Sequence, residues 1–148
     1  MRFIVGLLFI VSLSIASCGK EDQREIDQQL IQEYISENNL DASSTASGLH
    51  YVINNPGNNE HPNFSSTVKV IYTGTLLNGS QFDASDSAGI TLPLNQFIQG
   101  WIEGIPLFGK GGEGILIIPS HLGYGPSPRG SIPANSVLVF EIKLVNFN

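Results

Sequence analysis

The side chains that most often do chemistry form no familiar catalytic or metal-binding pattern in this chain of 148 residues. His50, His61 and His121 share no metal-ligand spacing, so no metal site is expected. Ser120 directly precedes His121 but lies in no Gly-x-Ser-x-Gly turn, which argues against a hydrolase triad. The single cysteine, Cys18, excludes an intramolecular disulfide and a cysteine-rich zinc site.

Two glycine-rich segments fit the spacing of nucleotide-binding loops but lack what such loops require. Segment 104–110 has the glycines and lysine of a P-loop, yet Gly111 stands where a serine or threonine must hold magnesium. Segment 109–114 fits a dinucleotide fingerprint, but it leads into a predicted strand instead of leaving a strand for a helix. No cofactor is therefore expected.

The aromatic residues are the remaining candidates. Those expected at inward-facing or loop-edge positions are Tyr72, Phe82, Trp101, Tyr124 and Phe140, and Asp83 directly follows Phe82. Taken singly, each aromatic side chain is more readily explained as part of the core than as part of a site. The order of their neighbours along the chain is what makes the group specific.

These residues must be positioned by a small antiparallel sheet, because from Leu49 onward the apolar residues alternate with a period of two. Strands are predicted at 49–53, 67–72, 115–118 and 137–147, and the Asn78-Gly79 pair predicts a hairpin leading into 80–82. One later segment has helical spacing, with Asn95 as N-cap and apolar residues up to Ile105. Segments 83–89 and 120–133 are expected as loops. The expected fold class is α+β, with one sheet covered by a single short helix.

Residues 1–17 have the features of a secretory signal peptide: Arg2, an apolar run from Phe3 to Leu13, and a small-residue end. The run is shorter than the about 20 residues that a membrane span needs. Cys18 follows directly, as in the bacterial lipobox, in which the cysteine becomes the lipidated first residue of the mature protein. A simple signal peptide ending near a cysteine is the alternative. We expect a lipoprotein of the cell envelope, anchored to a membrane outside the cytoplasm.

Residues 18–47 are expected to form an acidic helix and a linker that precede a domain at 48–148. Seven of the thirteen acidic residues lie between Glu21 and Asp41, and an apolar stripe at helical spacing runs from Ile26 to Ile35. Segment 38–39 is expected to end the helix, and the polar segment 41–48 is expected to be a linker. A spacer helix is favoured over a dimerisation helix, because one short stripe is weak evidence for a coiled coil. The net charge of −6, without a basic cluster, argues against nucleic acid as a partner.

Several long, ordered motifs point to one family. They are Val68-x-Val70-x-Tyr72-x-Gly74-x-Leu76, Asn78-Gly79-x-x-Phe82-Asp83, Ile98-x-Gly100-Trp101-x-Glu103-Gly104, the run from Ile117 through Pro119 and Tyr124 to Gly125, Ile132-Pro133-x-Asn135, and Leu138-Val139-Phe140-Glu141. Over about 49–146 the chain resembles the FKBP-type peptidyl-prolyl cis-trans isomerases. The resemblance implies a five- or six-stranded antiparallel sheet wrapped around one short helix, here preceded by the N-terminal helix.

The resemblance also implies a role for each site residue. Trp101 would form the floor beneath the substrate proline ring, and the Ile98 backbone N–H and the Tyr124 hydroxyl would bind substrate carbonyls. Asp83 would lie beside the reacting carbonyl and hold the Tyr72 hydroxyl. The apolar walls would be Tyr72, Phe82, Phe97, Ile98, Ile132 and Phe140.

The activity implied is proline isomerisation that assists the folding of exported proteins, with proline-containing polypeptides as substrates and macrolides as potential inhibitors. Ala88 and Leu92 stand where many members carry a further aromatic residue, and Ala134 replaces a proline often seen after Ile132. Substrate preference and inhibitor affinity are therefore expected to differ more than the reaction. The alternatives are a catalytically weak proline-binding chaperone or envelope-complex module, and a purely structural lipoprotein, for which the sequence offers no positive support.

Overall fold

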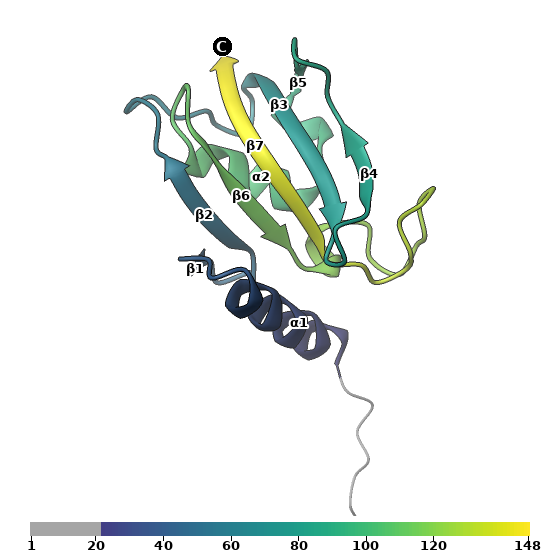
Figure 1. Ribbon diagram of the computed structural model, residues 1–148. Helices are drawn as coiled ribbons and strands as arrows, with labels where there is room; N and C mark the ends of the chain where they lie inside the picture. The colour runs from purple at the N-terminus through teal and green to yellow at the C-terminus, as the bar shows by residue number, and fades with distance from the viewer. Residues whose placement is uncertain (1–21) are drawn as a thin grey trace, which may run out of the picture.

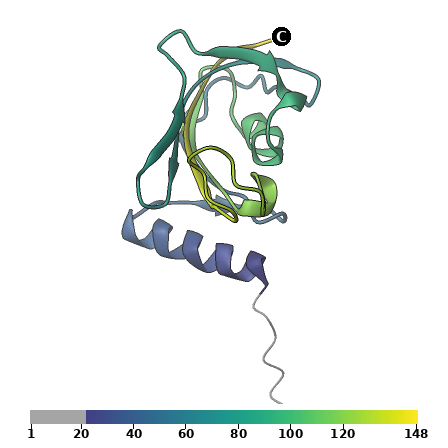
Figure 2. The ribbon, with the colours of Figure 1, turned by 90° about the vertical axis from the view of Figure 1, so that its right-hand side faces the viewer.

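The computed structural model describes residues 22–148, which form one curved antiparallel sheet with one helix inside its curve and another across one of its ends (Figures 1 and 2). The strands are β1 (Ser43–Ser44), β2 (His50–Asn55), β3 (Thr67–Leu76), β4 (Gln81–Ala84), β5 (Ile90–Pro93), β6 (Glu113–Ile118) and β7 (Leu138–Phe147). Their order is β1-β2-β6-β7-β3-β4, and β5 also pairs with β3. The predicted α+β class is confirmed. The sheet has seven strands, and two of them, the short β1 and β5, were not predicted from the sequence.

The two long strands β3 and β7 form the centre of the sheet and carry much of its core. Their pairing runs from Val68 opposite Phe147 to Leu76 opposite Leu138. On β7, the alternate residues Leu138, Phe140, Ile142 and Leu144 are all buried. The inward-facing stripe predicted for this strand is therefore confirmed, and it follows directly from the period of two in a strand.

Helix α2 (Gln99–Gly104) lies inside the curve of the sheet, as Figure 2 shows. Two glycines let it approach closely. A Cβ at Gly100 would lie 2.5 Å from Ile118 Cγ2, and one at Gly104 would lie 2.5 Å from Leu116 Cδ1. Trp101 and Ile105 are buried on the same side of the helix region. The small residues thus bring the helix, and Trp101 with it, down onto the sheet.

The predicted start of this helix is wrong. Asn95 belongs to the 3-10 turn η1 (Leu94–Gln96), and Ile98 is the N-cap of α2, with no side-chain capping bond. The physical reason is that Leu94 is fully buried, which anchors a separate turn, and Phe97 is extended, which interrupts the helical path. A second 3-10 turn, η2 (Ile105–Leu107), continues from α2, and a third, η3 (Ser120–Leu122), follows β6.

Helix α1 (Gln23–Glu37) packs across one end of the convex face of the sheet (Figures 1 and 2). Ile31 is fully buried there, in a cluster with Ile117, Val137 and Val139. Leu30, from the same predicted stripe, is 38% exposed. The helix ends at its C-cap Asn38, where the sequence placed its end.

Segment 41–48 is not the contact-poor linker that the sequence favours. Within it, β1 pairs with β2, and the Gln28 amide donates to the Gly48 carbonyl oxygen at 3.0 Å. The Ser47 hydroxyl donates to the Glu103 carboxylate of α2 at 2.7 Å. A polar segment that hydrogen-bonds to specific residues has the same composition as one that hydrogen-bonds to water. Composition alone therefore does not distinguish a packed segment from a linker. The boundary at residue 48 stays a prediction. Cys18 and segment 1–17 lie outside the described residues.

Within residues 22–148, no helix is long and apolar enough to cross a membrane.

Candidate active site

A pocket of about 430 Å³ opens on the concave side of the sheet, beside α2. Residues from several elements meet there: Tyr72 from β3, Asp83 from β4, Trp101 from α2, Tyr124 after η3, and Phe140 from β7. Segments distant in sequence therefore contribute one side chain each. The sheet and α2 fix four of these positions, the turn after η3 fixes that of Tyr124, and all five residues were predicted site residues.

Trp101 lies at the centre of the aromatic cluster and is 3% exposed. Its ring centroid is 5.0 Å from that of Tyr72 and 5.2 Å from that of Phe140, both in edge-on geometry. The Phe97 ring lies 4.7 Å away and is tilted by 31°. Such edge-on and offset contacts are favourable for aromatic pairs. They hold the indole as a rigid floor, with the other rings as walls.

Phe82 stands behind Phe140 instead of lining the pocket. The two rings meet edge-on with centroids 5.5 Å apart. Both cover Gly74 of β3, where a Cβ would lie 2.7 Å from Phe82 Cζ and 2.8 Å from Phe140 Cε1. Ile132, another predicted wall, is 6% exposed and packs into the main core. Phe82 and Ile132 thus support the walls.

The Tyr72 hydroxyl donates a hydrogen bond to Asp83 Oδ2 at 2.7 Å, which confirms the predicted pairing. Burial raises the pKa of Tyr72 far above its ordinary value, and the hydrogen bond to Asp83 and the charge of that carboxylate raise this pKa further. The phenol therefore keeps its proton and remains a donor. The bond fixes the Tyr72 ring against the pocket.

The groups expected to bind substrate carbonyls are free to do so. The Ile98 carbonyl accepts from the N–H groups of Trp101 and Ile102, which leaves the Ile98 N–H at the open start of α2. Neither this N–H nor the Tyr124 hydroxyl makes a hydrogen bond within the part of the chain that the structure describes. The Tyr124 ring is held from one side by Arg129, whose guanidinium carbon lies 4.9 Å from the ring centroid.

Comparison with known proteins agrees with this geometry. The profile of the family described as FKBP-type peptidyl-prolyl cis-trans isomerase matches residues 58–145. The chain belongs to this family. It is 42% identical over 132 residues to the FKBP-type peptidyl-prolyl cis-trans isomerase FkpA of Aeromonas hydrophila, a match that covers 86% of this chain and 49% of the relative. It is 39% identical over 117 residues to FkpA of Escherichia coli K12, a match that covers 78% of this chain and 43% of that relative.

Solved structures of FKBP-type proteins have the same fold. The crystal structure of FkpA from Escherichia coli superposes with a TM-score of 0.76 at 33% identity, covering 86% of this chain and 60% of that one. The crystal structure of AtFKBP13 superposes with a TM-score of 0.68 at 30% identity, covering 73% of this chain and 99% of that one. The chain spans about half the length of the curated relatives that it matches.

Three further residues line the pocket of this FKBP-type chain and were not predicted from the sequence: Ile90, Gln96 and Arg129. Leu92, noted only as a departure from the family pattern, also lines the pocket and is 40% exposed. Ile90 and Leu92 belong to β5, a segment for which no helix, strand or loop was predicted. Their alternation with Thr91 was the available signal, but four residues are too few to distinguish a strand from a loop.

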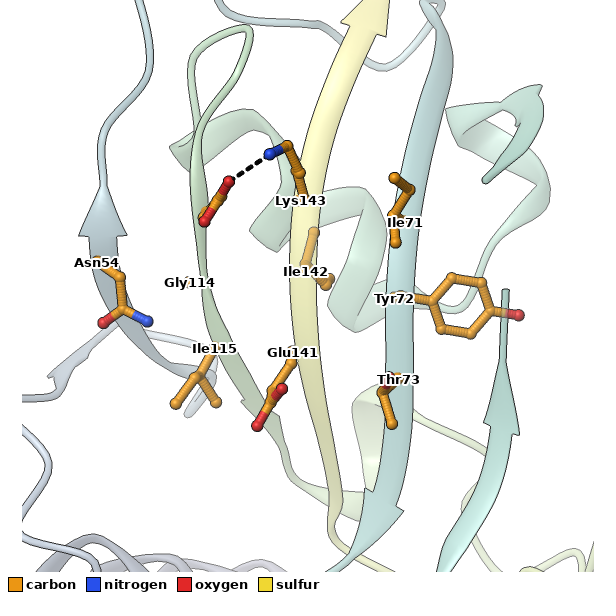
Figure 3. Close-up of a pocket in the computed structure, with 10 residues that line it drawn as sticks. Asn54, Ile71, Tyr72, Thr73, Gly114, Ile115, Glu141, Ile142 and Lys143 are labelled. Carbon is orange, nitrogen blue, oxygen red and sulfur yellow. Dashed lines mark ion pairs between the residues drawn. The ribbon is translucent and has the colours of Figure 1, made fainter. Parts of the chain in front are cut away.

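The convex face of the sheet has a second hollow, of about 510 Å³, shown in Figure 3. An ion pair between Lys143 and Glu113, with 2.6 Å between nitrogen and oxygen, lies along it. The Tyr72 ring points away from this hollow toward β4, as Figure 3 shows. This face lacks the enclosed aromatic lining, so the site is assigned to the concave side.

Among residues 22–148, no group of three or more His, Cys, Asp or Glu side chains is arranged to hold a metal ion.

Proposed function

We propose that this chain is a peptidyl-prolyl cis-trans isomerase that assists the folding of exported proteins. The observation that carries the proposal is the pocket itself: Trp101 as a buried floor among aromatic walls, beside the Tyr72–Asp83 hydrogen bond. Apolar walls suit a proline ring without demanding a particular neighbouring sequence. Proline-containing segments of unfolded or partly folded polypeptides are therefore the proposed substrates.

The reaction needs neither a nucleophile nor a metal. Rotation about the X–Pro bond is opposed by about 18–20 kcal/mol of amide resonance, and uncatalysed exchange takes about 10–100 s. The twisted amide has lost charge separation, so an apolar pocket binds it better than the planar, more polar amide. A preference of about 5 kcal/mol would accelerate the reaction several-thousand-fold.

The described groups have distinct parts in this mechanism. Trp101 and Phe140 contact the proline ring, while the Ile98 N–H and the Tyr124 hydroxyl hold substrate carbonyls and so set the position of the peptide. The Tyr72–Asp83 bond holds one wall where the amide twists. The same pocket is proposed to accept macrolide inhibitors, with an affinity altered by the aliphatic Leu92 at its rim.

We also propose that the protein is a lipoprotein of the cell envelope, attached through Cys18. The support is the arrangement of Arg2, the apolar run and Cys18 in the sequence. One acyl chain holds a protein only marginally, so stable attachment needs more than one. Cys18→Ala should release the protein from membranes or leave the precursor uncleaved, as read by fractionation and mass spectrometry. An unmodified mature terminus, or cleavage elsewhere, would refute the anchor.

Turnover of a prolyl tetrapeptide tests the catalytic proposal. Catalysed isomerisation, with Trp101→Ala as an inactive comparison, is the expected result. Binding can be followed separately through the fluorescence of Trp101, the single tryptophan of the chain. Binding without turnover would replace the isomerase by a proline-binding chaperone or envelope-complex module.

A further inference from the structure

Asp27 of α1 is a fully buried acidic residue outside the pocket. Its Oδ2 accepts hydrogen bonds from the Ser120 backbone N–H at 2.7 Å and from the Ser120 hydroxyl at 2.6 Å. Its Oδ1 accepts one from the Gln23 side-chain amide at 2.8 Å. No ion pair involves Asp27 within residues 22–148. A buried carboxylate is tolerated only when donors replace its water, and two of these donors belong to Ser120.

Ser120 begins the turn that carries Tyr124. Its carbonyl oxygen accepts from the N–H groups of Gly123 and Gly125, at 3.0 and 2.9 Å. Tyr124 lies between these two glycines, so both sides of its backbone are tied to Ser120. The far side of the turn is fixed as well, because the Asn135 N–H donates to the Gly125 carbonyl oxygen at 2.8 Å.

Asp27 is not needed merely to hold α1 on the domain. Ile31 is fully buried against the sheet, Gln28 donates to Gly48, and Gln32 is hydrogen-bonded to His50 at 3.1 Å. A buried charge adds little stability compared with an apolar residue of the same volume. The carboxylate instead fixes the orientation of Ser120, because the N–H and the hydroxyl of Ser120 both donate to the same oxygen, Asp27 Oδ2.

We propose that Asp27 is a positioning residue for Tyr124. The carboxylate on α1 holds Ser120, and Ser120 holds the turn that places the Tyr124 hydroxyl at the pocket. Helix α1 is then part of the support of the active site, although it contributes no lining residue. The inference rests on the proposed function, since it concerns the alignment of a substrate-binding group.

The test is a double-mutant cycle between Asp27→Ala and Tyr124→Phe, measured as kcat/KM on a prolyl tetrapeptide. In the unmodified chain, Asp27→Ala should lower kcat/KM about tenfold, because the loosened turn no longer presents the hydroxyl. In the Tyr124→Phe background, the same change should lower it less than about twofold. Asp27→Asn keeps an oxygen facing Ser120, and the introduced side-chain amide and that of Gln23 can rotate to hydrogen-bond to each other. This variant should therefore keep most of the kcat/KM that Asp27→Ala loses.

Ile31→Ala is the matched control, because it removes a buried contact of the same helix without touching Ser120. It should lower stability while leaving kcat/KM per folded molecule within about twofold. An equal loss from Asp27→Ala in both Tyr124 backgrounds, or no loss in either, would overturn the proposal. If Asp27→Ala does not fold, Ser120→Ala, which removes one donor only, replaces it in the cycle.

The two proposals can fail separately. If the unmodified chain shows no turnover, the isomerase proposal fails. The double-mutant cycle is then measured through the Kd of the tetrapeptide for each variant, from Trp101 fluorescence. A loss of affinity that depends on Tyr124 would still support Asp27 as a positioning residue. Independence from Tyr124 would refute it.

Discussion

Replacing Asp83 by alanine is predicted to lower turnover while leaving the fold intact. Asp83 is exposed, and within residues 22–148 its carboxylate has one hydrogen-bond partner, the Tyr72 hydroxyl at 2.7 Å. A hydrogen bond to a charged group contributes about 1.5–3 kcal/mol, and solvent at the pocket mouth reduces this value. We expect a loss of about 1–2 kcal/mol in the transition state, or about 5- to 30-fold in kcat/KM.

The assay measures turnover and urea midpoint on the same samples of Asp83→Ala, Tyr72→Phe and the double variant. The single variants should each lose turnover, and the double variant should lose little more than either, because both remove the same bond. Asp83→Ala should also lower stability, by up to about 1 kcal/mol, because the solvent-exposed bond is present in the folded state as well, but this loss should be smaller than the loss in the transition state. Asp41→Ala, at an exposed acidic residue away from the pocket, is the matched control and should leave turnover unchanged.

Two results would refute the reasoning. Full specific activity in an Asp83→Ala protein with a lowered midpoint would make Asp83 a structural turn residue. Losses that add in the double variant would show that the Tyr72–Asp83 bond is not the unit that acts, even if each residue matters separately.

Three further predictions follow from the described contacts. A truncated protein that begins at residue 47 should unfold at lower urea concentration and bind a hydrophobic dye, because removing α1 uncovers Ile117, Val137 and Val139. An unchanged urea midpoint would instead support a domain boundary at residue 48. Gly74→Ala should lower both stability, by about 1–3 kcal/mol, and turnover, because its Cβ would push the Phe82 and Phe140 rings apart; unaltered values of both would contradict the close packing. Since the pKa of Tyr72 is raised on folding, its contribution to stability is fully present below the ordinary tyrosine pKa of about 10 and is lost as pH rises further. Between about pH 9 and about pH 11.5, on either side of the ordinary tyrosine pKa, the urea midpoint of the unmodified chain should therefore fall more steeply than that of Tyr72→Phe. Parallel curves would argue against a raised pKa of Tyr72.

The parts of the fold that follow from local periodicity were predictable. The alternation of Leu138, Phe140, Ile142 and Leu144 determines which face of β7 is buried, and the Asn78-Gly79 pair marks the hairpin between β3 and β4. The Tyr72–Asp83 bond was predictable through the family resemblance, because the two residues occupy fixed places on paired strands, with Gly74 opposite Asp83.

The parts that depend on tertiary contacts were not predictable. Asp27 is one acid among seven in an acidic stretch, and only its place beneath Ser120 distinguishes it from its solvated neighbours. Asn95 is a good N-cap by residue type, but the burial of Leu94 fixes a separate turn there. Phe82 and Ile132 look like wall residues in sequence, whereas packing places them behind the lining.

The docking of α1 changes what the proposed anchor would do. A free helix of 15 residues would extend about 22 Å and lift the domain from the membrane by that length. Because α1 instead lies on the sheet, only the residues between Cys18 and Gln23 would connect the lipids to the folded unit, a reach of at most about 18 Å. Asp27, near the same end of α1, supports the turn that carries Tyr124. Attachment through Cys18 would therefore hold the end of α1 that supports the Tyr124 turn within about 18 Å of the lipids.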